Sequence, residues 1–235
     1  MELFVNVFAI SDLHLSINNP KPMDIFGPVW DDYIDKIIKD WNEKVTDDDV
    51  VLLPGDLSWA MKLDDAKVDI EIISKLKGKK ILLKGNHDYW WSTISKVRNV
   101  LPDNMYAIQN DCLEIGDYIF CGSRGWIVDN TKMTSSNDKK ILDRELIRLE
   151  MSLQSANKKL APGKKIICLM HFPPFDKYNN PTVFTKLIEK YNIKTVVYGH
   201  LHGKMLNIEK IININGTNYY LASCDMVGNK LVKIN

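Results

Sequence analysis

The sequence has neither an excess of charge of one sign nor a long apolar run. Its formal net charge is +1 and its pI is about 7.6, so no overall field attracts a phosphate backbone, and non-specific nucleic-acid binding is not expected. No segment approaches the roughly 20 apolar residues that a membrane helix requires. The apolar start, MELFVNVFAI, lacks the basic region of a secretory signal. We expect it to form a first strand.

Cysteine is also scarce, and its spacing does not match a zinc motif. The chain has four cysteines, Cys112, Cys121, Cys168 and Cys224, and no two of them form a C-x-x-C pair. Cys121 and Cys168 lie in apolar runs typical of buried strands, which favours reduced, packed thiols over disulfides or a zinc knuckle. Reduced thiols in turn indicate a cytoplasmic protein.

Nothing in the chain divides it into separate units. It contains no internal repeat, no low-complexity tract and no linker rich in proline, glycine or serine. Apolar residues make up 45% and charged residues 26% of the sequence, as in ordinary globular proteins. We therefore predict a single domain spanning residues 1–235, long enough to bury a large core.

Apolar runs and helical patterns alternate along the chain. Runs rich in apolar and β-branched residues predict buried strands at 4–10, 50–53, 81–83, 166–170 and 195–198. Apolar residues at helical spacing predict helices at about 30–41, 64–76, after Trp91, and 137–160. In the last of these helices, the apolar residues from Leu142 to Leu160 form one stripe along the helix, and core packing explains this stripe. Asn215-Gly216 lies between two apolar runs and predicts a β-hairpin. This order of elements predicts a mixed α/β fold.

All five histidines of the chain come just after predicted strands, next to other residues that can bind metals. The clusters are SDLH with Asp12 and His14, PGD with Asp56, GNHD with Asn86, His87 and Asp88, His171 before FPPF, and GHLH with His200 and His202. The carboxyl ends of strands are where ligands bind in α/β sheets. Each cluster alone is typical of a surface turn or a hydrogen-bonded core histidine. Together, their oxygen and imidazole ligands favour a site for first-row divalent metals.

The ordered motifs D-x-H, G-D, G-N-H-D, H and G-H-x-H resemble those of the calcineurin-like metallophosphoesterase superfamily, and they span most of the chain. This resemblance implies a four-layer α/β/β/α sandwich, with two mixed central sheets flanked by helices and a metal site at the strand ends. It also implies two divalent ions, and manganese, iron and zinc all suit the ligands. One ion would be bound by Asp12, His14 and His202, and the other by Asn86, His171 and His200. Asp56 would bridge them, because a carboxylate has two oxygens.

The neighbours of Asn86 are candidates for catalytic roles. The superfamily resemblance implies that His87 turns toward the substrate, as a general acid or to stabilise the transition state. Asp88 would hold the His87 imidazole in the required orientation and tautomer. Arg124 is one of only four arginines, and its planar fork suits phosphate oxygens. A surface ion pair is the alternative for Arg124.

The expected function is hydrolysis of phosphate esters, either monoesters or diesters, of a small-molecule substrate by hydroxide that two metals activate. The GNHD and GDLSW motifs lack the residues of protein serine/threonine phosphatases, and Trp59 replaces the metal-binding tyrosine of purple acid phosphatases. The segment 129–160 favours small substrates if it passes near the site. A nuclease and a non-catalytic metal-binding module are the alternatives. The sequence does not indicate an oligomeric state, and it predicts no membrane partner.

Overall fold

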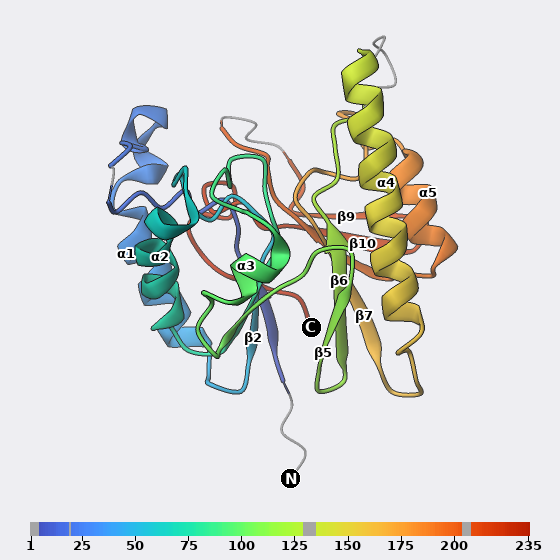
Figure 1. Cartoon of the computed structure of the whole chain (residues 1–235), viewed down its shortest axis with the longest axis horizontal. Helices are drawn as coiled ribbons and strands as arrows, with labels where there is room; N and C mark the ends of the chain where they lie inside the picture. Colours follow the sequence, from blue (N-terminus) through green and yellow to red (C-terminus); the bar gives the residue numbers. More distant parts are fainter. Residues whose placement is uncertain (1–4, 19, 129–134, 204–207) are drawn as a thin grey trace.

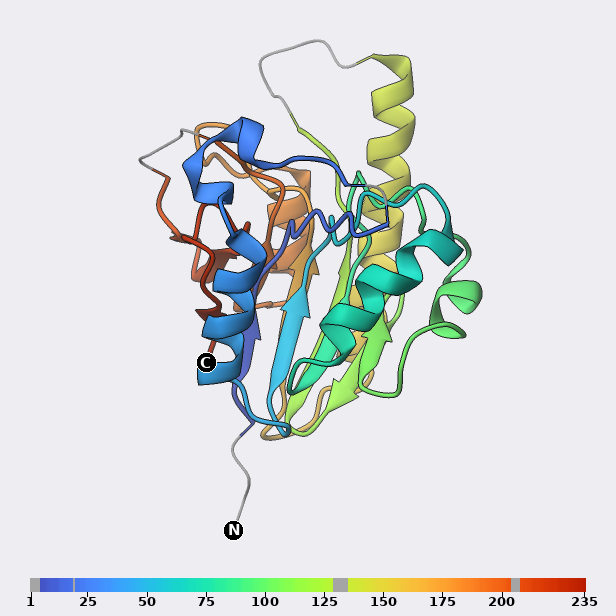
Figure 2. The same ribbon diagram turned by 90° about the vertical axis from the view of Figure 1, so that its left-hand side faces the viewer.

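Two β-sheets form the centre of the structure, with helices on both outer sides (Figure 1). This computed structural model describes residues 5–18, 20–128, 135–203 and 208–235. Helices α1 (Tyr33–Lys44), α2 (Leu63–Ser74) and α3 (Ile94–Arg98) lie on the side of the first sheet. Helices α4 (Ser136–Asn157) and α5 (Val183–Lys190) lie on the side of the second. Figure 2, turned so that the first side faces the viewer, shows α1 and α2 lying across the outer face of that sheet.

The first sheet has five strands, in the order β11-β1-β2-β3-β4. Its strands are β1 (Val7–Ala9), β2 (Val50–Leu53), β3 (Lys79–Leu82), β4 (Met105–Ala107) and β11 (Val232–Lys233). The strands β1 to β4 are parallel, and β11 pairs antiparallel with β1. Two short 3₁₀ helices, Asp24–Phe26 and Pro28–Trp30, precede α1.

The second sheet has six strands, in the order β5-β6-β7-β8-β10-β9. Its strands are β5 (Cys112–Ile115), β6 (Tyr118–Ser123), β7 (Lys165–Met170), β8 (Thr195–Tyr198), β9 (Ile211–Ile214) and β10 (Thr217–Leu221). The strands β6, β7, β8 and β10 are parallel, and both edge strands are antiparallel to their neighbours.

Successive strand residues enter different apolar layers, which is why these strands are apolar throughout. In β2, Val50 and Leu52 face the layer between the two sheets, whereas Val51 and Leu53 face the layer under the helices of the first sheet. The layer under α4 and α5 is a third cluster, which includes Leu149. Side chains of a strand point alternately to its two faces, so both faces of these sheets are covered. The predicted α/β/β/α sandwich is confirmed.

Most predicted elements are present, with shifts at their ends. The β2 and β8 strands have the predicted bounds, and Asn215-Gly216 forms the turn between β9 and β10 with φ of 52° and 81°. The predicted helix 137–160 ends at Asn157, and Leu160 beyond it is 47% exposed, so its assignment to the buried stripe was wrong. Helix α5 was not predicted.

Three further sequence expectations concern residues outside the described ranges, the thiols and the membrane. Residue 4 of the first predicted strand and residues 129–134 of the segment before α4 lie outside the described residues. The four cysteines have free thiols, and all but Cys112 are buried. Among the described helices, none combines the length and the apolar character needed to span a bilayer.

Candidate metal centre

The predicted metal ligands follow parallel strands of both sheets. Asp12 and His14 follow β1, Asp56 follows β2, Asn86 follows β3, His171 follows β7, and His200 and His202 follow β8. The fold therefore brings together side chains that are up to 190 positions apart in the sequence. Two groups of ligand atoms result within the described part of the chain, one around Asp12, His14 and His202 and the other around Asp12, Asp56 and His171.

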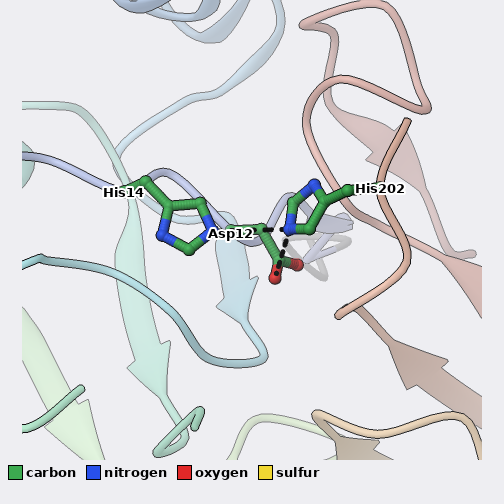
Figure 3. Close-up of side chains that lie close together, drawn as sticks. All are labelled: Asp12, His14 and His202. Atoms are coloured by element: carbon green, nitrogen blue, oxygen red, sulfur yellow. Dashed lines mark hydrogen bonds and ion pairs between the residues drawn. The ribbon is translucent and has the colours of Figure 1, made fainter. Parts of the chain in front are cut away.

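The first group joins the beginning of the chain to the loop after β8 (Figure 3). The Nε2 atoms of His14 and His202 are 3.3 Å apart, and His202 Nε2 is also 3.3 Å from Asp12 Oδ1. Asp12 and His14 are almost fully buried, whereas the His202 side chain is 32% exposed. This group matches the ligand set predicted for one of the two metals.

The second group, formed by Asp12, Asp56 and His171, lies next to the side-chain oxygen of Asn86. His171 Nε2 lies 3.4 Å from Asp56 Oδ2 and 2.6 Å from Asn86 Oδ1. The same Asp56 oxygen is 4.0 Å from His14 Nε2 of the first group. His200 belongs to neither group among the described residues. Its ring centroid is 5.1 Å from that of His171, and its backbone N–H donates to the Asp12 carboxylate.

Four of these residues have backbones in the left-handed region. The φ angles are 59° at Asp12, 47° at His14, 52° at Asp56 and 71° at His200. Residues other than glycine are uncommon in this conformation, although asparagine, aspartate and histidine adopt it more often than the rest, and each instance costs about 1–3 kcal/mol. Such strain concentrates at functional sites, because the surrounding structure holds the side chains in position.

Glycines beside the ligands allow backbone segments to approach closely. A Cβ atom on Gly85 would overlap the carboxylate and backbone N–H of Asp56, and one on Gly199 would overlap the carboxylate of Asp12. No residue with a side chain fits at either position without moving a ligand. These two glycines explain part of the G-N-H-D and G-H-x-H patterns.

Residues that the sequence analysis missed hold the ligands in place. Asp12 Oδ2 accepts hydrogen bonds from Ser11 Oγ at 2.5 Å and Ser223 Oγ at 3.1 Å. Asp225 Oδ1 lies 2.9 Å from His202 Nδ1 and fixes the direction of that ring. Ser223 and Asp225 follow β10 just as the predicted ligands follow their strands. Their position directly after a strand could therefore have identified them from the sequence.

Asp88 does not orient the His87 imidazole, which corrects the role expected for it. Its buried carboxylate instead accepts five hydrogen bonds, from the backbone N–H groups of Asp56, Leu57, Ser58 and Gly85 and from Trp90 Nε1. Burial and then the negative charge of Asp56 raise the pKa of Asp88 to about 6. Asp88 therefore fastens the loop after β2 to the loop after β3.

His87 lies at the edge of the centre, in contact with aromatic rings. Its backbone N–H donates to Asp56 Oδ1 at 2.7 Å. Its ring is 4.5 Å from that of Trp59 and 5.6 Å from that of His14, measured between centroids. The buried His87 Nδ1 has no hydrogen-bond partner among the described residues. Burial lowers the pKa of His87.

Arg124 joins a buried ion-pair cluster next to the centre. Its Nη2 is 3.5 Å from Oε1 of the buried Glu145, and its guanidinium carbon lies over the Trp126 ring, 5.0 Å from the centroid. The Arg124 carbonyl accepts hydrogen bonds from the backbone N–H groups of His171 and Phe172, at 3.2 and 2.9 Å. Arg124 is thus tied to a predicted ligand through the backbone, and the ion pair that was the alternative to substrate binding is largely buried rather than on the surface.

The acceptor atoms of the centre face one another in a way that suits bound cations. A carbonyl can only accept, so His171 Nδ1, 3.0 Å from Pro54 O, donates to it. In the neutral ring, His171 Nε2 is then a third acceptor facing the oxygens of Asn86 and Asp56. Three converging acceptors repel unless positive charge lies among them.

The pKa values of the histidines reflect the same arrangement. Burial lowers the pKa of His14 and of His200 to about 4, so both rings are neutral at pH 7 and have a free lone pair. Burial also opposes the charge of His171 and His202. Nevertheless, the Asp56 charge and hydrogen bond raise the pKa of His171, and hydrogen bonds to Asp12 and Asp225 raise that of His202 to about 10. Without a cation, protons on His171 and His202 supply the positive charge that the two carboxylates favour, and a divalent ion would displace these protons. The residues present therefore fit divalent metal ions.

Comparison with known proteins assigns the chain to a class and a family. The model of the calcineurin-like phosphoesterases matches residues 5–204. Fold, site and match together define a metal-dependent hydrolase acting on phosphoric ester bonds. The chain belongs to the calcineurin-like phosphoesterase family.

Individual proteins are similar to this chain at low sequence identity. A probable cyclic nucleotide phosphodiesterase of Coxiella burnetii is 21% identical over 215 residues, which cover 84% of this chain and 76% of the relative. A protein of unknown function from Aquifex aeolicus has a TM-score of 0.51 at 15% identity, with 98% of this chain and 96% of that one covered. The phosphopantetheinyl hydrolase of Mycobacterium tuberculosis has a TM-score of 0.56 at 14% identity, with 97% and 95% covered. These two structures share the fold.

Proposed function

We propose that the protein hydrolyses the phosphate esters of a small-molecule substrate, monoesters or diesters, with two divalent metal ions. The main support is the convergence of buried oxygen and nitrogen acceptors from both sheets into two groups that share Asp12 and adjoin at Asp56. Manganese, iron and zinc all suit such ligands. The Coxiella relative is named as a phosphodiesterase, which supports testing diesters first.

The ligands divide between two ions in this proposal. Asp12, His14 and His202 would hold one ion, and Asn86, His171 and His200 would hold the other. Asp56 Oδ2 faces His14 at 4.0 Å and His171 at 3.4 Å, which supports a bridging role for this carboxylate. Only two carboxylates belong to the proposed set, so the centre stays positive and attracts a phosphate oxyanion.

The reaction adds water across a P–O bond. Ions held by these residues would lower the pKa of water and neutralise the charge that develops on the phosphate oxygens. Water would add a hydroxyl group to phosphorus and release its other proton to solvent, and the electron pair of the broken P–O bond would go to the departing alcohol oxygen. In this proposal, His87 in its protonated form gives that oxygen a proton and regains one from solvent after the step.

The test compares metal-free and manganese-loaded protein on bis(p-nitrophenyl) phosphate, p-nitrophenyl phosphate and single-stranded DNA. We expect p-nitrophenolate release only with metal, and little cleavage of DNA because the chain has a net charge of only +1. Faster cleavage of DNA than of the small esters would favour a nuclease. Metal binding without any hydrolysis would favour a non-catalytic module.

Two substitutions separate the role of His87 from that of the ligands. The variant His87→Gln should keep its metal content and lose about 10²–10⁴-fold in turnover, the range of general acid–base catalysis. The variant Asp56→Asn should lose metal as well as activity, which elemental analysis of the purified proteins measures. Unchanged turnover in His87→Gln removes this residue from the mechanism.

A further inference from the structure

A hollow with an excess of positive charge lies beside the metal centre. We call it the basic hollow and define it by Lys84, Arg124, Arg144, Arg148 and Glu145, which lie among its lining residues. Its volume is about 300 Å³, at the lower end of the range for small-molecule sites. Four cationic side chains in it face a single carboxylate.

The chain places its arginines selectively. It has four arginines in total, against a large number of lysines, and three of the four line the basic hollow. The exception, Arg98, pairs with Asp111. A guanidinium presents donors in a planar fork that matches two phosphate oxygens at once, which an ammonium group does not. The selective use of arginine therefore favours recognition of an anion over general surface charge.

Glu145 arranges the arginines without neutralising them. Its side chain is 1% exposed, and its Oε1 is 2.7 Å from Arg148 Nη1, 3.5 Å from Arg124 Nη2 and 3.9 Å from Arg144 Nε. One carboxylate cannot balance three guanidinium groups. Among the described residues, the buried Arg124 Nε has no hydrogen-bond partner. Donor capacity and positive charge thus remain available inside the hollow.

The basic hollow adjoins the proposed metal ligands on both sheets. Lys84 is two residues before Asn86, which limits the distance between their Cα atoms to roughly 7 Å. The backbone carbonyl of Arg124 accepts a hydrogen bond from the backbone N–H of His171, at a distance of 3.2 Å. Helix α4 supplies the other wall through Arg144, Glu145 and Arg148. A phosphate group in the hollow and a phosphate group at the metals would therefore be close enough to belong to one small molecule.

We propose that the basic hollow binds a second phosphate group of the substrate, one that is not hydrolysed. This inference rests on the proposed function and narrows it to phosphate esters that carry another phosphate elsewhere in the molecule. The hollow holds that group by guanidinium hydrogen bonds, and so sets which ester phosphate reaches the metals. Free inorganic phosphate has the same chemistry, and the experiment must distinguish it from a substrate group.

The first arm measures phosphate binding without catalysis. Inorganic phosphate is titrated calorimetrically into metal-free protein, so that bound metals do not contribute. The variant Arg144→Gln is chosen because this side chain is 53% exposed and its ion pair is long, so the fold should tolerate its loss. Arg148→Gln is the second variant, and Lys159→Gln, an exposed residue after the end of α4, is the matched control. We expect at least about tenfold weaker binding in both arginine variants and no change in the control.

The second arm measures substrate preference in manganese-loaded protein. Matched pairs differ only in a second phosphate: glucose 6-phosphate with glucose 1,6-bisphosphate, and adenosine 5′-phosphate with adenosine 3′,5′-bisphosphate. We expect kcat/KM to favour the bisphosphate by about tenfold or more in at least one pair, and this ratio to fall in the arginine variants but not in Lys159→Gln.

The outcomes separate the inference from the function on which it rests. If wild-type protein hydrolyses p-nitrophenyl esters but prefers neither bisphosphate, the substrate assignment is overturned. In that case, phosphate binding that is lost in the arginine variants identifies the hollow as a site for free inorganic phosphate rather than for a phosphate group of the substrate. If the arginine variants bind phosphate as well as wild type does, the hollow is not an anion site. If no ester is hydrolysed at all, the proposed function fails, and the calorimetric arm still decides whether the hollow binds phosphate.

Discussion

Replacing Asp88 with asparagine should weaken the fold at the metal centre, rather than only slow the reaction. Oδ1 of Asp88 accepts from the N–H groups of Leu57, Ser58 and the Trp90 indole, and Oδ2 accepts from those of Asp56 and Gly85. Asparagine keeps one accepting oxygen and places an NH₂ group at the other position. Whichever way the amide is turned, at least two buried donors then face another donor.

The expected loss follows from those unpaired donors. Each buried donor without an acceptor costs about 1–3 kcal/mol. Removing the negative charge next to Asp56 offsets part of this loss, since like charges repel in a buried site. We therefore expect the free energy of unfolding to fall by about 2–4 kcal/mol.

Urea unfolding of the metal-free proteins measures this difference, with Asp48→Asn at an exposed position as the control. Manganese titration of the same variant should show weaker binding, because Asp56 and Asn86 lie in the two loops that Asp88 fastens together. A variant with wild-type stability and metal affinity but low turnover would refute this reasoning. That result would restore the role of Asp88 in orienting His87.

Two further substitutions test the close packing and the acid sensitivity of the structure. Gly85→Ala should displace the Asp56 carboxylate, so elemental analysis should find less bound metal, whereas Gly163→Ala, at a glycine with open space around it, should not change metal content. Burial raises the pKa of Asp49, but hydrogen bonds from Thr46 and Asn6 outweigh it and lower the pKa overall. Asp49→Ala should therefore cost about 2 kcal/mol at pH 7. In urea unfolding, this difference should narrow as the pH falls below about 4, where the unfolded carboxyl becomes protonated; a difference independent of pH contradicts this.

The sequence was sufficient to predict the layers of the fold, but it was not sufficient to predict where some helices end. Strands β2 and β8 were predicted with their observed bounds because each is a short apolar run with both faces buried. Helix α5 was missed because it has only eight residues, and its capping box uses Thr182 and Thr185 rather than the usual glutamate. Leu160 was misassigned because apolar spacing continues past the point where α4 ends.

The proposed ligands were visible in the sequence because each follows a strand that was itself recognisable. The supporting contacts were not visible in the same way. The bonds of Asp88 go to backbone N–H groups, which every residue has, so no spacing of residue types signals them. The basic hollow depends on how α4 packs against β6, beside the residues that follow β3. Apolar periodicity predicts that a helix packs, but not which of its charged residues reach a neighbouring loop.

The division of the proposed ligands between the sheets has a consequence for the integrity of the protein. Asp12, Asp56 and Asn86 belong to loops of one sheet, and His171, His200 and His202 belong to loops of the other. Ions held by both sets would act as cross-links between two halves that otherwise meet mainly through an apolar layer. A chelator would then do more than stop turnover: it would lower the melting temperature and expose the seam between the sheets to proteolysis.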